Sequence, residues 1–565
     1  MPHGEATAPG HPPASHDAVG AAAGRAAFWR RHGLTALLLL GLALALRLPG
    51  LAWLPSPTGD EANWARYAEQ AARGRIVVLD PAHRGNSPAF AYLLGGTLRL
   101  GGRSFGVLRL PQAVLVAVGC ALCYLLLAAG GRRWAGLAAA GLLAVHPVSV
   151  LWSRTIAVPY PLALVGMTVA VLWLWRGLSR RAPGQVAGAI LLLAATAHLT
   201  PLAVVVVPGC LALMGRPASR WSLRHPTVLA AGCLGAAASV PLVFWMLQTP
   251  VTANKVLLVE LGPKLLAAAH MLLTGLWGEA TVRHFTNHAL PLLPAGVLAL
   301  ALVLVLVLAT GRRQTRAAAA PLAGLGLVLL ASGAVLMPLS LAPARRWYLG
   351  TIDAERYLFT LLPGLALCLG ALAETAATGM RPGARRTAAA LVVVAGLIVA
   401  GATGRTLEPL VRRSGIFRGP SVLHGGECYH GWLTTADRVA PVEIVRDLVQ
   451  RTGATTVLYE DVALRPLRWM LRDLPVTVFD YRDVHTWHQR AGVFLTVIWS
   501  AQVADPVAIP RAASFEIGRH GLLFSAGFSQ AKLERRVVQP DGRPLLEIWS
   551  AQHQGVTWQP DPAHR

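Results

Sequence analysis

Long apolar runs, separated by short polar connections, fill the chain from about residue 34 to residue 404. A helix needs about 20 mostly apolar residues to cross the hydrocarbon core of a bilayer, and about eleven runs are near that length. The pattern therefore predicts a polytopic α-helical membrane domain over 34–404. The expected spans are 34–51, 105–129, 135–152, 159–175, 185–199, 201–215, 227–247, 290–310, 319–341, 357–375 and 387–404.

The connections between these runs differ in length. Two are long, 52–104 and 248–289, and the second includes "GPKLLAAAHMLLTGLWG", which suits an amphipathic helix lying along the membrane surface. The runs 185–199 and 201–215 are short, and "AHLTP" separates them, so they can instead form one re-entrant pair. Residues 1–33 are rich in Pro, Gly, Ala and His, which predicts a disordered tail.

The pattern changes after residue 404. Short apolar runs of the strand type occur in "ATTVLYED", "LPVTVFDY", "GVFLTVIWS" and "PLLEIWSA". The segment "PVEIVRDLVQRTG" has the spacing of an amphipathic helix that ends at Gly453. Because helix and strands alternate early in this region, residues 405–565 predict a small soluble α/β domain.

Charge decides which side of the membrane each connection faces. Alternate connections, "GGRRW", "RGLSRRAPG", "GRPASRWSLRHP", "TGRRQTR" and "TGMRPGARR", hold two or three Arg and no acid. Arginine-rich connections face the cytoplasm, so the N-terminus is cytoplasmic and the C-terminal domain lies on the periplasmic or outer side of the cell (inner) membrane. The remaining connections hold the acids Asp60, Glu61, Glu69, Asp80, Glu260, Glu279, Asp353 and Glu355.

Composition agrees with a membrane protein and argues against a nucleic-acid partner. The chain is 54% hydrophobic and only 14% charged, whereas soluble domains carry about a quarter charged residues. A net charge of +24 alone would suit nucleic acid. The arginines, however, lie in the connections between apolar runs, so membrane lipids are the expected anionic surroundings.

The first long outer connection contains an acidic pair, Asp60 and Glu61, at the start of "GDEANWARYAEQAARG". The residues that follow predict a helix lying in the membrane interface. Asp60 suits the N-cap, and Glu61 complements the helix dipole. A carboxylate fixed and kept ionised there can also act as a general base on an acceptor hydroxyl. We therefore expect Asp60 to be the catalytic base and Glu61 the next candidate.

Several arginines fall on the outer side, where the positive-inside rule does not require them. Among them are Arg154, Arg356 and the pair Arg345–Arg346. The guanidinium group donates paired hydrogen bonds to phosphate, so a phosphorylated ligand explains Arg356, with Arg154 as a second candidate. Ordinary pairing with acids or lipid headgroups is the alternative, and we expect it for Arg345 and Arg346.

The order of several motifs resembles a known family. They are "GDEANWARYA", "NSPAFAYLLGGTLRLGGRSFGVLRLPQAV", "LLAVHPVSVLWSRTIAVPYPLAL", "TAHLTPL" and "DAERYLFTLLPGLAL". Over about residues 34–404 they resemble membrane glycosyltransferases of the GT-C fold, especially bacterial relatives of protein O-mannosyltransferases and of lipid A aminoarabinose transferases. Asn86-Ser87-Pro88 departs from the family, which often has a basic residue and two prolines there.

The resemblance implies a fold and an activity. The fold would be a GT-C-like membrane domain with a C-terminal extracytoplasmic domain. The activity would be transfer of a sugar from a polyprenyl-phosphate donor to an acceptor hydroxyl on a protein, lipid A or a glycan, by a single inverting displacement. The residues implied are Asp60 and Glu61 for catalysis and Arg356, Arg154 and Tyr357 for the donor phosphate. His198, His83 and Asn86 are further candidates for substrate contact, although a lone His at a helix end is more often a hydrogen-bonded interface residue than a catalyst.

No cofactor is predicted. The sequence has no His, Cys or Asp cluster with metal-site spacing. Asp60 and Glu61 can in principle hold a divalent metal, but a monophosphate donor does not require one.

Two other functions compete with the transferase. A transporter or flippase of lipid-linked sugars needs polar groups at mid-membrane depth. The centres of the expected spans here carry almost no charge, which favours chemistry at the membrane surface. A non-catalytic envelope assembly protein, with the C-terminal domain as its recognition module, is the third alternative.

Overall fold

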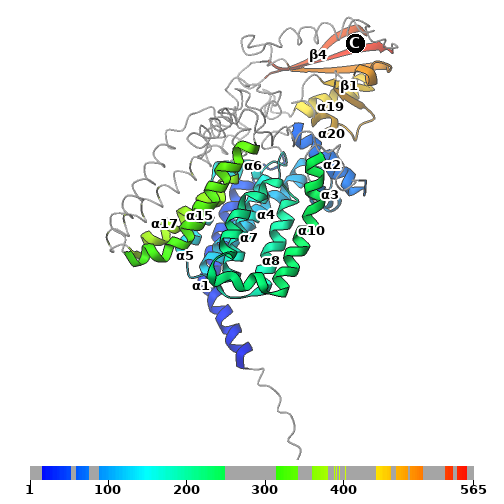
Figure 1. Ribbon diagram of the computed structural model, residues 1–565. Helices are drawn as coiled ribbons and strands as arrows, with labels where there is room; N and C mark the ends of the chain where they lie inside the picture. Colours follow the sequence, from blue (N-terminus) through cyan, green and yellow to red (C-terminus); the bar gives the residue numbers. More distant parts are fainter. Residues whose placement is uncertain are drawn as a thin grey trace, which may run out of the picture.

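A bundle of roughly parallel and antiparallel helices makes up the larger part of the molecule, and a sheet-containing C-terminal part lies at one end (Figure 1). The computed structural model describes residues 16–52, 59–75, 88–248, 313–340, 359–379, 441–459, 466–480, 484–499, 528–538 and 544–555, with isolated positions between 383 and 401. The expected span 290–310, all but isolated positions of the expected span 387–404, and most of the connection 248–289 lie outside these residues.

The bundle follows most of the predicted apolar runs, but its first helix begins at His16, so residues 16–33 are helical and not the disordered tail that the composition predicted. Its elements are α1 (His16–Arg47), α4 (Phe105–Ala129), α5 (Arg133–Val145), α6 (Pro147–Ser153), α7 (Tyr160–Ser179), α8 (Pro183–Ala197), η2 (Pro201–Val206), α9 (Val207–Met214), η3 (Pro217–Arg224), α10 (Pro226–Gln248), α15 (Arg313–Ser340) and α17 (Leu362–Gly379). Among the described residues, three helices are long and apolar enough to cross a membrane, or five if each bent pair is one span. The full count of about eleven stays a prediction.

The two bent pairs have a clear chemical cause. Between α5 and α6 the chain turns by 53°, where Pro147 opens the second helix and His146 takes an extended ψ. A residue before proline is driven out of the helical region, so a single straight span cannot form. The segment 202–224 turns by 106° before η3, which Pro217 opens. The short runs 185–199 and 201–215 correspond to α8 and to η2 with α9.

Close helix contacts build the core of the bundle. Helix α4 packs on α1, α5 and α7, while α8 packs on α7 and α10. Gly119 of α4 faces Val165 of α7, and a Cβ at position 119 would come within 1.7 Å of a Val165 methyl carbon. Any larger residue at 119 would therefore force these two helices apart.

The C-terminal part is a five-stranded mixed sheet with the strand order β2-β1-β3-β5-β4. Its strands are β1 (Thr456–Tyr459), β2 (Thr477–Asp480), β3 (Ala491–Trp499), β4 (Phe528–Val538) and β5 (Pro544–Gln554). Strand β1 runs parallel to β2 and β3, whereas β3–β5 and β5–β4 are antiparallel. Helix α19 (Pro441–Thr452) precedes β1 and ends at Gly453, and the short helices α20 (Pro466–Met470) and α21 (Val484–Trp487) link the parallel strands.

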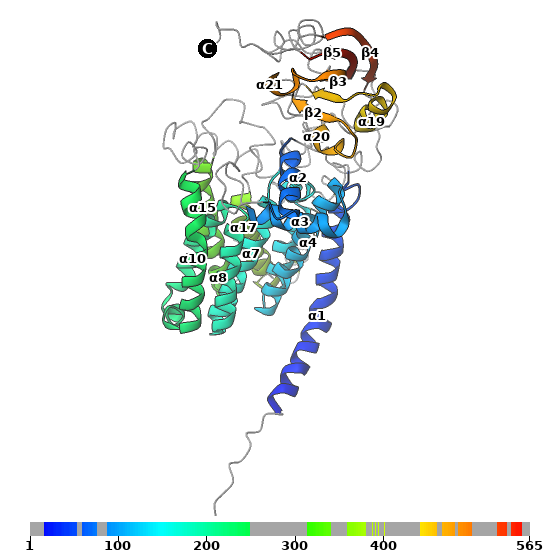
Figure 2. The ribbon, with the colours of Figure 1, turned by 90° about the vertical axis from the view of Figure 1, so that its right-hand side faces the viewer.

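A helical hairpin joins these two parts. It consists of α2 (Gly59–Ala72) and α3 (Pro88–Gly101). Both views place the hairpin at the end of the bundle nearest the C-terminal strands (Figures 1 and 2). The described residues of the first long connection, 52–104, are therefore packed between the bundle and the sheet.

Candidate active site

The helix α2 lies tightly against α3, with its first turn directed toward the bundle. A Cβ at Gly95 of α3 would come within 2.8 Å of the Ala68 carbonyl oxygen, so the two backbones approach as closely as glycine permits. Trp64 meets Phe90 edge-on, with ring centroids 4.8 Å apart. Both rings belong to one buried cluster that also takes in α4, so α2 is held rigidly.

The two carboxylates at the start of α2 have different environments. Glu61 is fully buried and forms a bidentate ion pair with Arg109 of α4, whose Nε and Nη2 donate to it at 2.8 and 2.6 Å. The backbone N–H of Ile156 donates to the same carboxylate at 2.9 Å. The expectation that Glu61 is the next candidate base stays a prediction. A carboxylate already bonded to three donors inside the protein serves to hold α2, α4 and the α6–α7 junction together.

Asp60 precedes it in the first turn of α2 and stays half-buried. Successive residues of an α-helix are rotated by about 100° around its axis, so the side chains of Asp60 and Glu61 leave the helix in different directions. The positive end of the helix dipole favours its ionised form. Of the acidic pair, Asp60 is the carboxylate with accessible surface.

Arg154 is buried at the junction between α6 and α7. Its Nη1 donates to the carbonyl oxygens of Leu46 and Arg47, both at 3.0 Å, and its Nη2 donates to the carbonyl oxygen of Pro49. The guanidinium thus satisfies carbonyls at the C-terminal end of α1 that the helix itself leaves unpaired. Both Nη atoms of Arg154 are directed to the protein backbone, and its expected role in binding the donor phosphate stays a prediction.

Arg47, which the sequence analysis did not single out, is a third buried arginine at this end. Its guanidinium donates to the carbonyl oxygens of Ala144 at 2.8 Å and Leu143 at 3.2 Å, and to the Ser149 hydroxyl at 3.1 Å. These bonds cover the bend between α5 and α6. The available signal was a charge at the end of an apolar run, which needs a partner when it is buried.

Further polar contacts fix the α6–α7 junction opposite α2. The Gln112 amide of α4 donates to the carbonyl oxygens of Trp152, Thr155 and Val158 at 3.0, 2.6 and 3.2 Å. The Trp64 indole of α2 donates to the Ala157 carbonyl oxygen at 3.2 Å. The segment after Arg154 is therefore held from two helices at once.

The other predicted site residues are only partly described. His198, at the end of α8, is half-buried, and its Nε2 lies 3.0 Å from the Ala238 carbonyl oxygen of α10. Its neighbour Leu199 packs against the α2–α3 cluster, so His198 belongs to the same end of the bundle. His83, Asn86, Arg356 and Tyr357 lie outside the described residues. Over the part of the chain that is described, no group of three or more His, Cys, Asp or Glu side chains is placed to hold a metal.

The C-terminal part contacts α2 directly. Trp469 of α20 is buried against Phe105, with ring centroids 4.5 Å apart, and its indole donates to the Glu69 carboxylate at 3.1 Å. Arg472 forms an ion pair with the same carboxylate, and its guanidinium lies 4.4 Å from the Trp469 ring centroid. The sheet region thus reaches the helix that carries Asp60.

This architecture is that of a known membrane-protein fold. The chain superposes on the crystal structure of ArnT from Cupriavidus metallidurans in the apo state with a TM-score of 0.50 and 12% identity, covering 91% of this chain and 97% of that chain. The structure of ArnT from the same organism bound to undecaprenyl phosphate gives 0.47 and 13% over the same shares. The first likeness identifies the GT-C fold.

A family match in the sequence accompanies the fold. Residues 85–245, from α3 to α10, match the profile of the family described as dolichyl-phosphate-mannose-protein mannosyltransferase. That segment includes Arg109, Arg154 and His198, and it begins after the acidic pair of α2. No curated protein matches the sequence of this chain. Together the fold and the family match confirm the resemblance to GT-C membrane glycosyltransferases that the motifs predicted.

Proposed function

We propose that this chain transfers a sugar from a polyprenyl-phosphate carrier to an acceptor hydroxyl, at the end of the bundle that carries α2. The family match over 85–245 and the GT-C fold support a glycosyltransferase. By the arginine distribution, this end faces the periplasm or the outside. The acceptor hydroxyl would belong to a protein, lipid A or a glycan.

The observation that carries the proposal is the different environment of the two carboxylates, since Asp60 is half-buried and Glu61 is fully buried. Glu61 is fully buried and bonded to α4 and the α6–α7 junction. Those bonds fix the first turn of α2, and Asp60 is part of that turn. A general base positioned in advance lowers the entropic cost of reaching the reactive geometry.

The reaction is a single displacement at the anomeric carbon. Asp60 accepts the proton of the acceptor hydroxyl while its oxygen bonds to that carbon and the bond to the carrier phosphate oxygen breaks. The products are an inverted glycoside and the polyprenyl phosphate. The phosphate takes up negative charge as it leaves, and Arg356 with Tyr357 remain the proposed donors to it. The described residue Phe359, three positions after Arg356, lies against Tyr160 at the start of α7, with ring centroids 6.5 Å apart.

The test compares two neighbouring carboxylates. Purified full-length protein in lipid is given a panel of polyprenyl-phosphate sugars with cell-envelope extract as acceptor, and donor consumption is followed by mass spectrometry. Asp60→Asn should lower transfer by about 10²–10⁴-fold, the usual contribution of a general base, with an unchanged unfolding temperature. Glu61→Gln, its matched neighbour, should lower the unfolding temperature.

Two results would contradict the proposal. Full transfer by Asp60→Asn would remove Asp60 as the base. Vectorial movement of a lipid-linked sugar across sealed vesicles, without breakage of the sugar–phosphate bond, would instead establish a flippase.

A further inference from the structure

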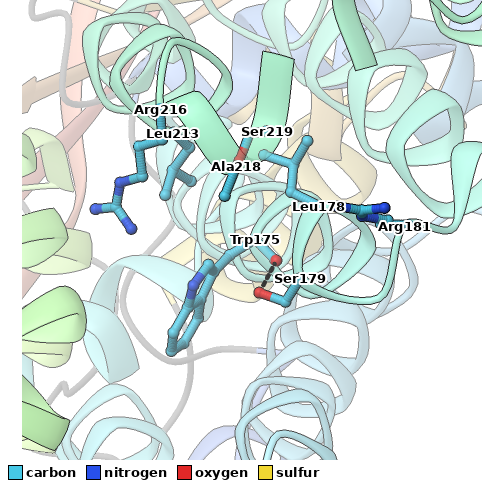
Figure 3. A pocket seen from close by; sticks show the side chains of 8 residues that line it. All are labelled: Trp175, Leu178, Ser179, Arg181, Leu213, Arg216, Ala218 and Ser219. Atoms are coloured by element: carbon cyan, nitrogen blue, oxygen red, sulfur yellow. Dashed lines mark hydrogen bonds between the residues drawn. The ribbon is translucent and has the colours of Figure 1, made fainter. Parts of the chain in front are cut away.

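A pocket of about 230 Å³ lies at the opposite end of the bundle from α2. It is lined by the end of α7 and by α9 with η3 (Figure 3). Helix α7 begins beside the α6–α7 junction and has 20 residues, so the pocket is about 30 Å from the candidate active site. Its lining residues are Trp175, Leu178, Ser179, Arg181, Leu213, Arg216, Ala218 and Ser219.

Two arginines flank the pocket from different elements. Figure 3 shows Arg181, after α7, and Arg216, before η3, on opposite sides of it. Both side chains are exposed, and neither guanidinium has a hydrogen bond or ion pair to another residue that the structure describes. The sequence from 176 to 225 contains six arginines and no Asp or Glu, so no acid of this segment can neutralise them. An anion from outside the chain would complete the charge balance.

The backbone at Arg181 is a second, independent observation. Helix α7 ends with the bonds Ala182 N–H to Gly177 O at 2.9 Å and Arg181 N–H to Leu178 O at 3.3 Å. This is the Schellman arrangement, in which glycine usually takes the left-handed residue. Arg181 occupies it with φ 52°.

The same arrangement elsewhere in this chain uses glycine. Gly74 after α2 and Gly131 after α4 have φ of 69° and 77° and make both equivalent bonds, and Gly453 after α19, with φ 66°, has the outer one, from Ala454 N–H to Val449 O. A left-handed conformation is unfavourable for a residue with a Cβ, and such residues are concentrated at functional sites. Arginine at this one helix end therefore indicates that its charge is used.

The size and lining of the pocket indicate the ligand class. Pockets that enclose a whole small-molecule ligand measure about 300–1,000 Å³, so this one suits a smaller headgroup whose remainder lies outside it. Leu178, Leu213 and Trp175 supply apolar surface beside the two cations. Basic pockets between membrane helices on the cytoplasmic side favour phosphate-containing lipid headgroups.

We propose that Arg181 and Arg216 form a binding site for the phosphodiester headgroup of an anionic phospholipid, on the side of the membrane opposite the transfer reaction. The guanidinium groups donate to the phosphate oxygens from two sides. The acyl chains pass along the apolar surface of α7 and α9. The site is separate from the donor site, and its test does not depend on transferase activity.

The experiment measures lipid binding by the full-length protein in an uncharged detergent. Phosphatidylglycerol is titrated while the unfolding temperature is recorded, and phosphatidylcholine and inorganic phosphate are titrated in parallel. We expect phosphatidylglycerol alone to stabilise the wild type. Arg216→Gln and Arg181→Gly should each weaken its apparent affinity about fivefold, and the two together about thirtyfold. Arg220→Gln, an exposed η3 arginine that does not line the pocket, should keep wild-type affinity.

Arg181→Gly also separates the lipid site from a structural role. Glycine relieves the left-handed backbone, so the lipid-free unfolding temperature should stay the same or rise while lipid affinity falls. Lower lipid-free stability with unchanged affinity would overturn the assignment of Arg181. Equal losses in Arg216→Gln and Arg220→Gln would replace a defined site with general surface charge, and equal stabilisation by inorganic phosphate would exclude the lipid as the source.

Discussion

The two ends of the helical bundle use the same residue type in opposite ways. At the α2 end, Arg47, Arg109 and Arg154 are completely buried, and each guanidinium is bonded to backbone or carboxylate oxygens. At the other end, arginines such as Arg181 and Arg216 are exposed around a pocket. A buried arginine must find internal acceptors, so it fixes helices relative to each other. An exposed arginine needs no internal acceptor, so its charge is available to the surroundings of the protein.

The largest expected effect of this contrast is on the Glu61–Arg109 pair. Glu61→Ala should destabilise the protein by about 3–5 kcal/mol, because it leaves a buried charge without its partner. Arg224→Gln, which removes an exposed charge at the opposite end, should change stability by less than about 0.5 kcal/mol. Thermal and denaturant unfolding in detergent measures both. Similar losses in the two variants would mean that burial does not distinguish the two ends.

A double variant sharpens the same point. Arg109→Leu combined with Glu61→Met should recover part of the loss, because apolar replacement of both partners removes the isolated charge. Recovery should stay incomplete, since Leu51 O and Ile156 N–H lose their partners as well. No recovery at all would show that the charge itself is not the source of the loss.

The next effect concerns Arg154. Arg154→Met should destabilise the bundle by about 2–3 kcal/mol, because three carbonyl oxygens near the end of α1 lose a charged donor. The stability of Arg154→Lys should fall between those of the wild type and Arg154→Met, since an ammonium group cannot reproduce the paired hydrogen bonds of the planar guanidinium. Unfolding is again the measurement. If Arg154→Met keeps the wild-type unfolding temperature but binds the donor much more weakly, the result would instead support the role of Arg154 in binding the donor phosphate.

A smaller effect is expected where the C-terminal part meets α2. Trp469→Phe keeps the ring against Phe105 but removes the donor to Glu69, at a cost of about 1 kcal/mol. Limited proteolysis should then release the C-terminal part about fivefold faster, because cleavage follows the population of the opened form. Arg468→Ala changes an exposed neighbour on α20 and serves as the control. If Glu69→Gln and Trp469→Phe have fully additive effects, the two side chains are not coupled.

The smallest effect is expected from an exposed ion pair, in contrast to the buried one. The Arg446 guanidinium donates to Asp473 and lowers the pKa of that carboxyl below its usual value. A lowered folded-state pKa gives stability that is present above the unfolded-state pKa, near 4, and lost as the pH falls through the folded value. Asp473→Asn should flatten the pH dependence of the free energy of unfolding in that range. An unchanged slope would mean that other carboxyl groups cause this pH dependence.

The apolar pattern predicted the helices well because span length and burial are local properties of the sequence. It placed α4, α7 and α10 within a few residues of their observed ends. Strands β1, β2, β3 and β5 lie in the predicted runs. Strand β4, with the sequence "FSQAKLERRVV", escaped notice because this edge strand is mostly polar and exposed.

The site was less predictable, because its contacts join distant parts of the chain. The sequence analysis named Glu61, and Arg109 lies within one of the quoted motifs, but nothing in the sequence indicated that the two would bond across 48 residues. For the same reason the sequence did not separate Glu61, which is bonded inside the protein, from Asp60. The left-handed backbone of Arg181 could not be expected either, since the residue type argues against it.

The bond from Arg109 to Leu51 O has a consequence for how the protein assembles. One guanidinium holds both Leu51 and Glu61, so it closes the chain between α1 and α2 into a loop. The ribosome synthesises α1 and α2 before α4, so Leu51 and Glu61 are already present when Arg109 is synthesised. Until they meet, α4 carries an uncompensated charge near its N-terminal end, which is costly in lipid. Insertion of α4 is thereby coupled to completion of the α2–α3 hairpin that precedes it in the chain.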